Sequence, residues 1–472
     1  MRPRRRPDRD GVRLPSSRQG GRPRRQEVRA QPVPRGNFAP VLAERTDVGP
    51  FPARGVVPPD LDGRLVRNGP NPILPLAPDD PDGWLAGDGM LHAVSLRDGR
   101  ATAYRNRWVR TRRLSHALGT PSPRGPAEPL DGPANVHVVR HAGRTLVLGE
   151  SGLPLAVSDD LERARLHDFD GDLASPVGAH PRVDPETGEL ALFGTDVYGP
   201  PFLRYHLADR EGRLMLTEEV DLPRPSLMHD FGITATRAVF FDSPALFDAA
   251  LAGRAPVPYR WTPDAPSRIG VMPRSGGAVR WVPIEPCLVV HVVNCFDSGD
   301  RVVIDAVRHE RALDGGPASR CEAAPQLVRW TVDPVGLRAE TRQLDDAAVE
   351  LPRVDERVVG RPHRFAYAVA VDASPDRVEF PALVQYDLDR ERSVRYEPGA
   401  GRSVSEPIFV RAGDGRAEDE GWVLVLVHDA ARQASDLVVL DGTSFAGPPV
   451  AVVELPARVP FGLHGSWMPT GT

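Results

Sequence analysis

The feature of this sequence that most constrains its fold is a long succession of short β-rich runs, each ending at a turn. From about Asn37 onward, a run of β-favouring residues meets a Gly-, Asp- or Pro-bearing turn, and a second run follows. The clearest examples are HVVRHAGRTLVLGE, PRVDPETGELALFG, VRWTVDPVGLRAETRQL, LVQYDLDRERSVRYEP and LVVLDGTSFAGPPVAVVEL. Runs joined in this way predict β-hairpins. The clearest candidate for a helix is short: residues 243–253, SPALFDAALAG, with Ser243 available as the N-cap.

Hairpins over a chain of 472 residues restrict the architecture. A single sandwich cannot absorb this much strand, whereas a β-propeller stacks four-stranded blades around an axis and protects most strand edges. No WD or kelch signature is present, so the blades would be diverged. We predict one propeller domain over residues 37–472; a tandem of sandwiches is the alternative. Residues 1–36, rich in Arg and Pro, predict a disordered tail, either a polyanion-binding arm or a solvated extension.

Composition excludes several classes of function. The formal net charge is -5 and the chain contains no lysine. Nucleic acid is therefore not an expected partner, and Schiff-base chemistry and P-loop phosphate binding are excluded. The cysteines Cys287, Cys295 and Cys321 form no C-x-x-C pair, which indicates reduced, buried thiols. No apolar run approaches the roughly 18 residues that span a bilayer, so we expect a cytoplasmic protein.

The sequence has 13 histidines, and four of them share a distinctive context. Most, such as His167 and His206, are expected at the surface. Each of the four lies close to a predicted strand end, beside a Gly-, Asp- or Pro-bearing turn; they are His180, His229, His291 and His464. The intervals between them are close to one propeller blade of about 50 to 60 residues, or a small multiple of it. Equivalent strand ends converge on a propeller axis, where imidazoles would suit Zn, Cu, Fe or Ni. The alternative is four unrelated histidines, each hydrogen-bonded locally.

Six segments in order resemble those of the carotenoid cleavage oxygenase family, which includes the retinoid isomerohydrolase of the eye and the lignostilbene dioxygenases. They are GRLVRNGPNP, GDGMLHAVSLRDGRATAYRNRWVRT, AHPRVDPETGEL, SLMHDFGIT, SEPIFV and GLHGSW. The resemblance runs from about Leu61 to Pro469. It implies a seven-bladed β-propeller with loops and short helices capping the face over the metal site. It also implies one Fe(II) per chain, held by His180, His229, His291 and His464, with Asp230 shaping the turn beside its neighbour.

The resemblance further implies three glutamates that support histidines from behind. These are Glu150 in LVLGESGLP, Glu350 in AAVELPRVD and Glu406 in SVSEPIFV. A carboxylate that accepts the Nδ1 hydrogen fixes the tautomer and turns Nε2 towards the metal. Val136 stands where many relatives have threonine, and it is expected near an open iron position.

The activity that the resemblance implies is oxidative cleavage of a conjugated C=C bond of a carotenoid or apocarotenoid with O2, giving two carbonyl products. No catalytic acid, base or nucleophile from the protein is expected beyond the metal centre. Stilbene-cleaving relatives tend to place a lysine before the first of these glutamates, whereas this chain has Gly149 there. An apolar polyene is therefore the expected substrate, with stilbenoid cleavage, or a propeller binding protein with a non-catalytic metal site, as alternatives. A lactonase-type hydrolase would favour oxygen ligands instead.

The apolar segment VFFDSPALFDAALAG, residues 239–253, is open to more than one interpretation. It is expected either to line the mouth of a substrate tunnel, to touch a membrane surface peripherally, or to pack as a helix on the propeller.

Overall fold

The computed structural model describes residues 36–74, 83–126, 132–255, 257–313, 324–374, 377–413 and 415–471. The expected tail lies outside these ranges, except for Gly36. Cys321 also lies outside them. Pro32–Thr472 forms a single compact unit. Among the described residues the one α-helix is α1 (Arg112–Leu118), with Thr111 as its N-cap and Gly119 in the left-handed region after it. Short 3-10 helices are η1 (Gly36–Phe38), η2 (Gly83–Ala86), η3 (Phe169–Gly171), η4 (Glu356–Val358) and η5 (Gly442–Ser444).

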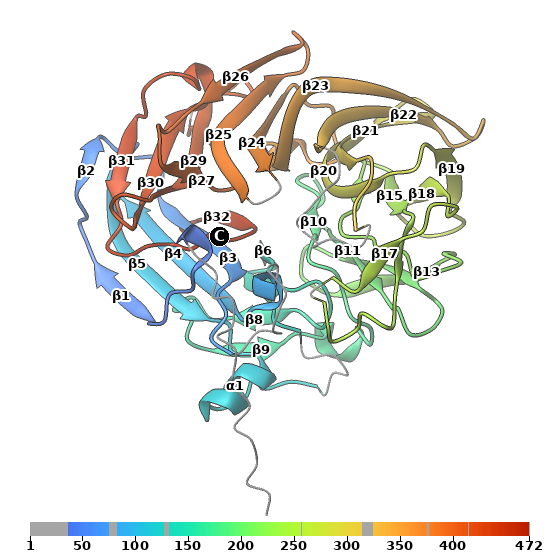
Figure 1. The fold of residues 1–472 in the computed structure, drawn as a ribbon, viewed down its shortest axis with the longest axis horizontal. Coiled ribbons are helices and arrows are strands. Elements are labelled where there is room, and N and C mark those ends of the chain that lie inside the picture. The colour runs from blue at the N-terminus through green and yellow to red at the C-terminus, as the bar shows by residue number, and fades with distance from the viewer. Residues whose placement is uncertain are drawn as a thin grey trace, which may run out of the picture. The chain divides into compact units, whose positions relative to one another are not determined.

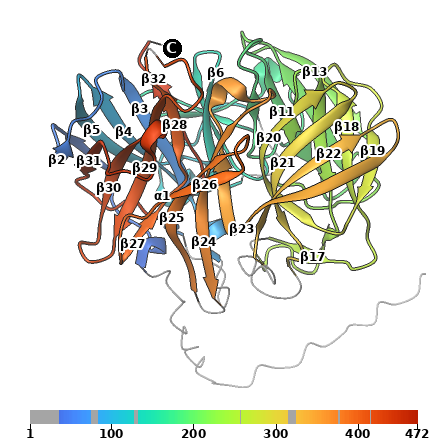
Figure 2. The same ribbon diagram turned by 90° about the horizontal axis from the view of Figure 1, so that it is seen from above.

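The hydrogen-bonded strands of the described chain divide into seven blades arranged about an axis (Figures 1 and 2). Blade 1 consists of β32 (Gly465–Pro469), β3 (Gly63–Pro70), β4 (Gly89–Arg97), β5 (Arg100–Trp108) and β1 (Arg45–Val48). Blade 2 consists of β6 (His137–His141), β7 (Arg144–Leu148), β8 (Leu155–Val157) and β9 (Ala164–Leu166). Blade 3 consists of β10 (Arg182–Val183), β11 (Leu190–Thr195), β12 (Leu203–Ala208) and β13 (Leu214–Val220). Blade 4 consists of β14 (Gly232–Ile233), β15 (Arg237–Asp242), β18 (Ser267–Pro273) and β19 (Arg280–Ile284).

One long strand, β23 (Arg338–Arg353), serves two blades. Its residues 338–348 pair with β22, and its residues 349–353 pair with β24. Blade 5 consists of β20 (Leu288–Ser298), β21 (Arg301–His309), β22 (Gln326–Asp333) and the first part of β23. Blade 6 consists of the last part of β23, β24 (Phe365–Ser374), β25 (Arg377–Asp387) and β26 (Arg392–Tyr396). Blade 7 consists of β27 (Arg402–Val404), β28 (Ile408–Arg411), β29 (Gly421–Asp429), β30 (Ala434–Asp441), β31 (Ala451–Glu454) and β2 (Ala53–Gly55).

The five hairpins expected from turn chemistry are confirmed as β6–β7, β10–β11, β22–β23, β25–β26 and β30–β31. The β6–β7 turn shows the local cause. Ala142 and Gly143 both have positive φ, 48° and 71°, which is the backbone twist that joins two adjacent antiparallel strands.

The prediction of a helix over residues 243–253 is wrong. Ala245–Phe247 instead forms strand β16, which pairs with β17 (Tyr259–Trp261) in a separate two-stranded sheet, and turns follow it. The backbone there bonds to distant partners: the amide of Leu227 donates to the carbonyl of Ala245 at 2.7 Å, and the amide of Phe247 donates to that of Pro225 at 2.9 Å. Pairing with residues outside the segment has overridden a local helical preference.

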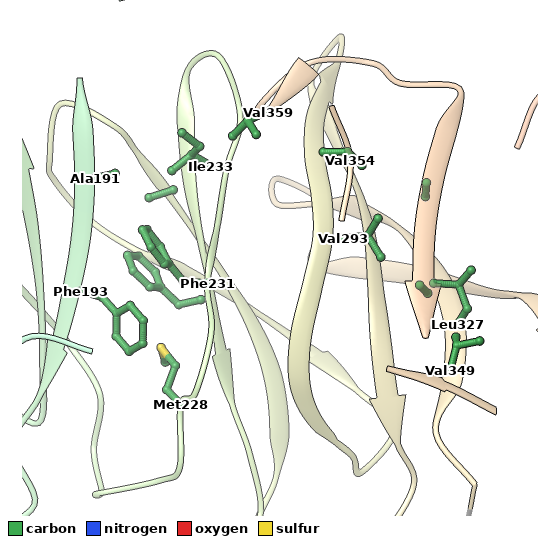
Figure 3. Close-up of a cluster of buried hydrophobic side chains, with 14 of the residues drawn as sticks. Ala191, Phe193, Met228, Phe231, Ile233, Val293, Leu327, Val349, Val354 and Val359 are labelled. Atoms are coloured by element: carbon green, nitrogen blue, oxygen red, sulfur yellow. The ribbon is translucent and has the colours of Figure 1, made fainter. Parts of the chain in front are cut away.

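The ring of blades is closed at two places by segments far apart in sequence. β32 pairs with β3 inside blade 1, and β2 pairs with β31 at the edge of blade 7. Apolar side chains also fill the space between the first and last blades, including Leu61, Leu65 and Tyr104 on one side and Leu424, Leu437 and Val453 on the other. Similar clusters lie between the other neighbouring blades, and Figure 3 shows part of the largest. The seven-bladed propeller is therefore confirmed. Within the described residues, no helix has the length and apolar character needed to cross a membrane.

Candidate metal centre

The structure brings together the four histidines that share a sequence context. His180, His229 and His464 each lie just before the first-named strand of blades 3, 4 and 1, and His291 lies within β20 of blade 5. One ligand atom from each residue lies within 4.8 Å of the others, and the Nε2 atoms of His180 and His229 are 3.0 Å apart. We call these residues the four-histidine cluster. Four separate, locally bonded histidines would not converge in this way.

Apolar neighbours and one aspartate fix the position of His229. Met228 and Phe231, on either side of it, are buried in the core between blades, where the ring of Phe231 lies 5.2 Å from that of Phe193 (Figure 3). Asp230 accepts hydrogen bonds from the amide of Phe231 at 2.7 Å and from Val292 of the next blade at 2.8 Å. Asp230 therefore shapes this turn, as expected, and also ties it to the strand that carries His291.

Three glutamates stand behind three of the histidines. The Nδ1 atom of His464 donates to Glu406 at 2.7 Å, and that of His229 donates to Glu150 at 3.0 Å. The Nδ1 atom of His291 donates to Glu350 at 2.5 Å. Blades 7, 2 and 6 supply these carboxylates, whereas blades 1, 3, 4 and 5 supply the histidines, so every blade contributes one residue. For His180, the nearest carboxylate oxygen, on Asp230, is 3.9 Å away.

Burial and neighbouring charges act differently on the histidines of the cluster. Burial and the neighbouring imidazoles hold the pKa of His180 well below its usual range, and burial lowers the pKa of His464 to about 4 although Glu406 opposes this. Burial alone would raise the pKa of Glu406, but Arg353 and His464 outweigh it, and the pKa is lowered. His180 and His464 are therefore neutral nitrogen donors. Burial alone would lower the pKa of His229, but Glu150 outweighs it and the pKa is raised, so a proton competes with a metal ion for this imidazole. A carboxylate that accepts from Nδ1 directs the opposite Nε2 towards the centre of the cluster.

The arrangement fits a metal ion. The Nε2 atom of His291 is buried and has no hydrogen-bond partner among the described residues. An orphaned buried acceptor is costly unless something satisfies it. Several imidazole nitrogens directed at one point suit Fe, Zn, Cu or Ni.

A cavity of about 1330 Å3 opens onto the cluster. His229, His291 and His464 form part of its wall, together with Val136 and Glu150. Its apolar lining includes Leu227, Phe247, Val257, Leu288, Val290 and Leu313. Loops, η2, the start of α1 and the β16–β17 hairpin contribute to it, so the expected capping elements are present. Phe247, Ala252 and Gly253 place the later part of the segment 239–253 on the cavity wall, whereas Val239 and Phe241 at its start are buried between blades.

Several residues of the site were not predicted from the sequence. His309 donates from Nε2 to Glu350 at 2.6 Å, and Arg353 donates to Glu406 at 3.3 Å. His137 lies beside Val136 at the start of β6, with its ring centroid 5.1 Å from that of His464. Its position at the start of its blade, like that of His180, was a signal that could have found it. The others have no local signal.

The expectation that His206 lies at the surface is wrong. It is 1% exposed and lines the cavity, because its face of β12 packs towards blade 2. His167 is half-buried, rather than exposed, and lies close to Phe169. Cys287 and Cys295 are buried and unpaired, as expected.

Comparisons with known proteins agree with this geometry. A model of the retinal pigment epithelial membrane protein family matches residues 38–469. A carotenoid cleavage oxygenase of Mycobacterium tuberculosis is 35% identical over 93% of this chain and 98% of its own length. An isoeugenol monooxygenase of Pseudomonas nitroreducens is 30% identical over 92% of this chain and 97% of its own.

Among solved structures, the cobalt-substituted apocarotenoid oxygenase (ACO) of Synechocystis superimposes with a TM-score of 0.80. It is 27% identical, and the match covers 92% of this chain and 98% of that one. Family model, relatives and structure thus agree over nearly the whole described propeller. The chain belongs to the family of the retinal pigment epithelial membrane protein and the carotenoid cleavage oxygenases.

Proposed function

We propose that the four-histidine cluster holds one Fe(II) per chain, and that the protein uses O2 to cleave a conjugated C=C bond of a carotenoid or apocarotenoid into two carbonyl products. The observation that carries this proposal is the convergence of four imidazoles on the wall of a large cavity with a substantial apolar lining. When bound, the iron would supply the binding and activation of O2. The named relatives support the reaction class.

The residues around the cluster prepare the site and surround the substrate. Glu150, Glu350 and Glu406 keep protons on Nδ1, so that the opposite nitrogens stay available. Val136 is buried beside the cluster and adds an apolar surface to the cavity wall. Apolar walls favour a polyene because they remove its surface from water.

The preference for a polyene rests on the residue before Glu150. A Cβ atom on Gly149 would lie 3.1 Å from the amide nitrogen and 3.2 Å from the Cα atom of Ala134. A lysine there, as in stilbene-cleaving relatives, would need the backbone of Ala134 to shift. A cation that binds a phenolate is thus absent from the place where such enzymes have it.

Cleavage of a phenolic alkene is the second candidate, and specific observations favour it. Isoeugenol monooxygenase is among the relatives. Two arginines, Arg113 and Arg204, line the cavity and could supply the missing cation. A direct assay is therefore needed to decide between a polyene and a phenolic alkene as the substrate.

The metal assignment is tested with His464→Ala, compared with His116→Ala at an exposed position of α1 as the matched control. Wild type and control should each carry about one iron per chain, and His464→Ala should lose iron and cleavage while remaining folded. Full iron occupancy in His464→Ala would overturn the ligand assignment. Iron retained by wild type with no O2 uptake on any polyene or alkene would favour a binding protein.

The substrate assignment is tested by assaying an apocarotenal and a 4-hydroxystilbene side by side, with 18O2 and with exchange into water controlled. We expect two carbonyl products from the apocarotenal, with label in both. Efficient turnover of the stilbene, and none of the polyene, would overturn the substrate and leave the iron site intact.

A further inference from the structure

The cavity has two chemically different sides. One side, from blades 4 and 5 and the β16–β17 hairpin, is mainly apolar. The other side comes from blade 3 and the segment before it, and presents hydroxyl, imidazole and guanidinium groups. We call it the polar wall, and it consists of Ser175, Arg204, His206 and Thr217.

His206 links two hydroxyl groups of the polar wall. Its Nε2 atom lies 3.2 Å from the Oγ of Ser175, and its Nδ1 atom lies 2.9 Å from the Oγ1 of Thr217. Burial, with the charge of Arg204, lowers the pKa of His206 to about 4, so the ring is neutral at neutral pH. A neutral ring donates from one nitrogen and accepts at the other. Each hydroxyl therefore retains hydrogen-bonding capacity for a group in the cavity.

Arg204 supplies the positive charge of the polar wall. It is half-buried, and its guanidinium forms no hydrogen bond or ion pair within the part of the chain that the structure describes. Glu219 stands opposite it on β13, and the carboxylates of Asp172 and Asp196 line the same cavity, yet Arg204 pairs with none of them. Arg113, the other arginine of the cavity, instead pairs with Asp88 at 2.8 Å.

A guanidinium on a cavity wall, without an internal partner, is a ready donor for an incoming oxygen. Arginine has five N–H donors and no acceptor, so a carbonyl or carboxylate is its natural complement. The adjacent hydroxyls can donate to the same oxygen or accept from a hydroxyl beside it. The rest of the cavity offers apolar surface for the chain to which that oxygen is attached.

We propose that the polar wall binds the oxygen-bearing end of an apocarotenoid, an aldehyde or carboxylate, through Arg204. This inference rests on the proposed function and deepens it. Because the same cavity reaches both the polar wall and the four-histidine cluster, anchoring one end of a rigid polyene fixes which double bond lies beside the cluster. Arg204 then acts as a positioning residue for bond selection.

The test compares Arg204→Met, which keeps an apolar stem of similar length, with Arg210→Met, an exposed site on the same hairpin. Full-length, iron-loaded protein is titrated without O2, so that binding is measured by quenching of tryptophan fluorescence and no cleavage occurs. The ligands are an apocarotenal, an apocarotenoic acid and a hydrocarbon polyene of matched length, with a 4-hydroxystilbene as a further arm.

We expect Arg204→Met to weaken binding of the aldehyde and the acid roughly 10- to 100-fold, the range for a lost hydrogen bond to a charged group. Binding of the hydrocarbon should change less than about twofold, and Arg210→Met should match wild type. With O2, Arg204→Met should give a mixture of cleavage positions where wild type gives one. Unchanged thermal unfolding and iron content would show that the fold is intact.

The proposal would be overturned if Arg204→Met weakened the binding of all polyenes equally, or weakened the binding of none. Dependence on Arg204 for the hydroxystilbene alone would also overturn it, in favour of a phenolic occupant. Because binding is measured without turnover, a protein that shows the expected dependence but cleaves no polyene would overturn the proposed function alone.

Discussion

The three imidazole–carboxylate pairs of the candidate metal centre differ in how their carboxylates are held. The side chain of Glu406 is 0% exposed and that of Glu350 is 15% exposed, whereas that of Glu150 is 45% exposed. The first two lie behind the cluster, inside blades 7 and 6. Glu150 lies on the cavity wall. Two of the three carboxylates are therefore sealed in protein, and the third faces the space where substrate is expected.

The sealed pair is held by more than its histidines. Glu406 also accepts from the amide of Gly465 at 2.8 Å and from Arg353 at 3.3 Å. Glu350 also accepts from the amide of Leu351 at 2.9 Å and from His309 at 2.6 Å.

Glu150, by contrast, has His229 as its hydrogen-bond partner in the described chain. A charge sealed in protein must be fully bonded, whereas a charge beside a cavity can be solvated. Glu406 and Glu350 are thus each held by several partners, whereas Glu150 is held by one. Three substitutions can test that difference.

The largest effect is expected from Glu406→Gln. It removes an ionised partner of His464 and breaks a buried pair with Arg353, so both iron retention and the free energy of unfolding should fall. We expect a loss of about 3 kcal/mol, the lower end for a broken buried pair, because Arg353 keeps Glu356 as a second partner. Urea unfolding and iron content measure the two effects.

Glu356→Gln is the matched control, because Glu356 pairs with the same arginine from a side chain that is 62% exposed. It should behave almost like wild type. Since the pKa of Glu406 is lowered in the folded protein, its stabilising charge is present above the ordinary value of 4.5 and is lost as the pH falls. The stability gap between wild type and Glu406→Gln should therefore shrink in acid; a gap that widened would contradict this account.

An intermediate effect is expected from Glu350→Gln. Iron affinity should fall within the roughly 10- to 100-fold range for a lost carboxylate partner, because a neutral amide holds the His291 tautomer less firmly. Stability should fall less than in Glu406→Gln, since no arginine loses its partner. Competition with a chelator measures the affinity, and wild-type retention would show that Glu350 does not support the metal.

The smallest effect is expected from Glu150→Gln. Iron affinity should fall by about 10-fold, the low end of the same range, and the midpoint of urea unfolding should not change. The same chelator and urea assays apply. A loss of iron as large as that in Glu406→Gln would remove the distinction between the sealed and the cavity side.

Local chemistry predicted the hairpins, since turn residues act on their immediate neighbours. A common centre was predicted from the repeating sequence contexts of His180, His229, His291 and His464. Ring closure was beyond local reasoning, because β32 and β2 pair with strands from the other end of the chain. Residues 243–253 were misjudged because partners outside the segment, in β17 and in residues 225–227, decided their structure. No local pattern in HERAL (residues 309–313) or ELPRVD (residues 350–355) indicates that His309 and Glu350 form a hydrogen bond.

His206 shows a second kind of limit. Alternation along a strand identifies two faces, but it does not say which face meets the next blade. Arg204 and His206 share one face of β12, and only the position of blade 2 reveals that this face borders a cavity. The four-histidine cluster could be anticipated because it lies on the axis, where all blades converge.

The closing strand β32 has a consequence for the order of events during synthesis. His180, His229 and His291 belong to blades made early, whereas His464 immediately precedes β32, which must dock on β3 from the far end of the chain. A growing chain therefore presents an incomplete four-histidine cluster until β32 has been made and seated. If the cluster holds iron as proposed, binding by all four imidazoles requires a closed ring, so iron held in this way would report a completed propeller.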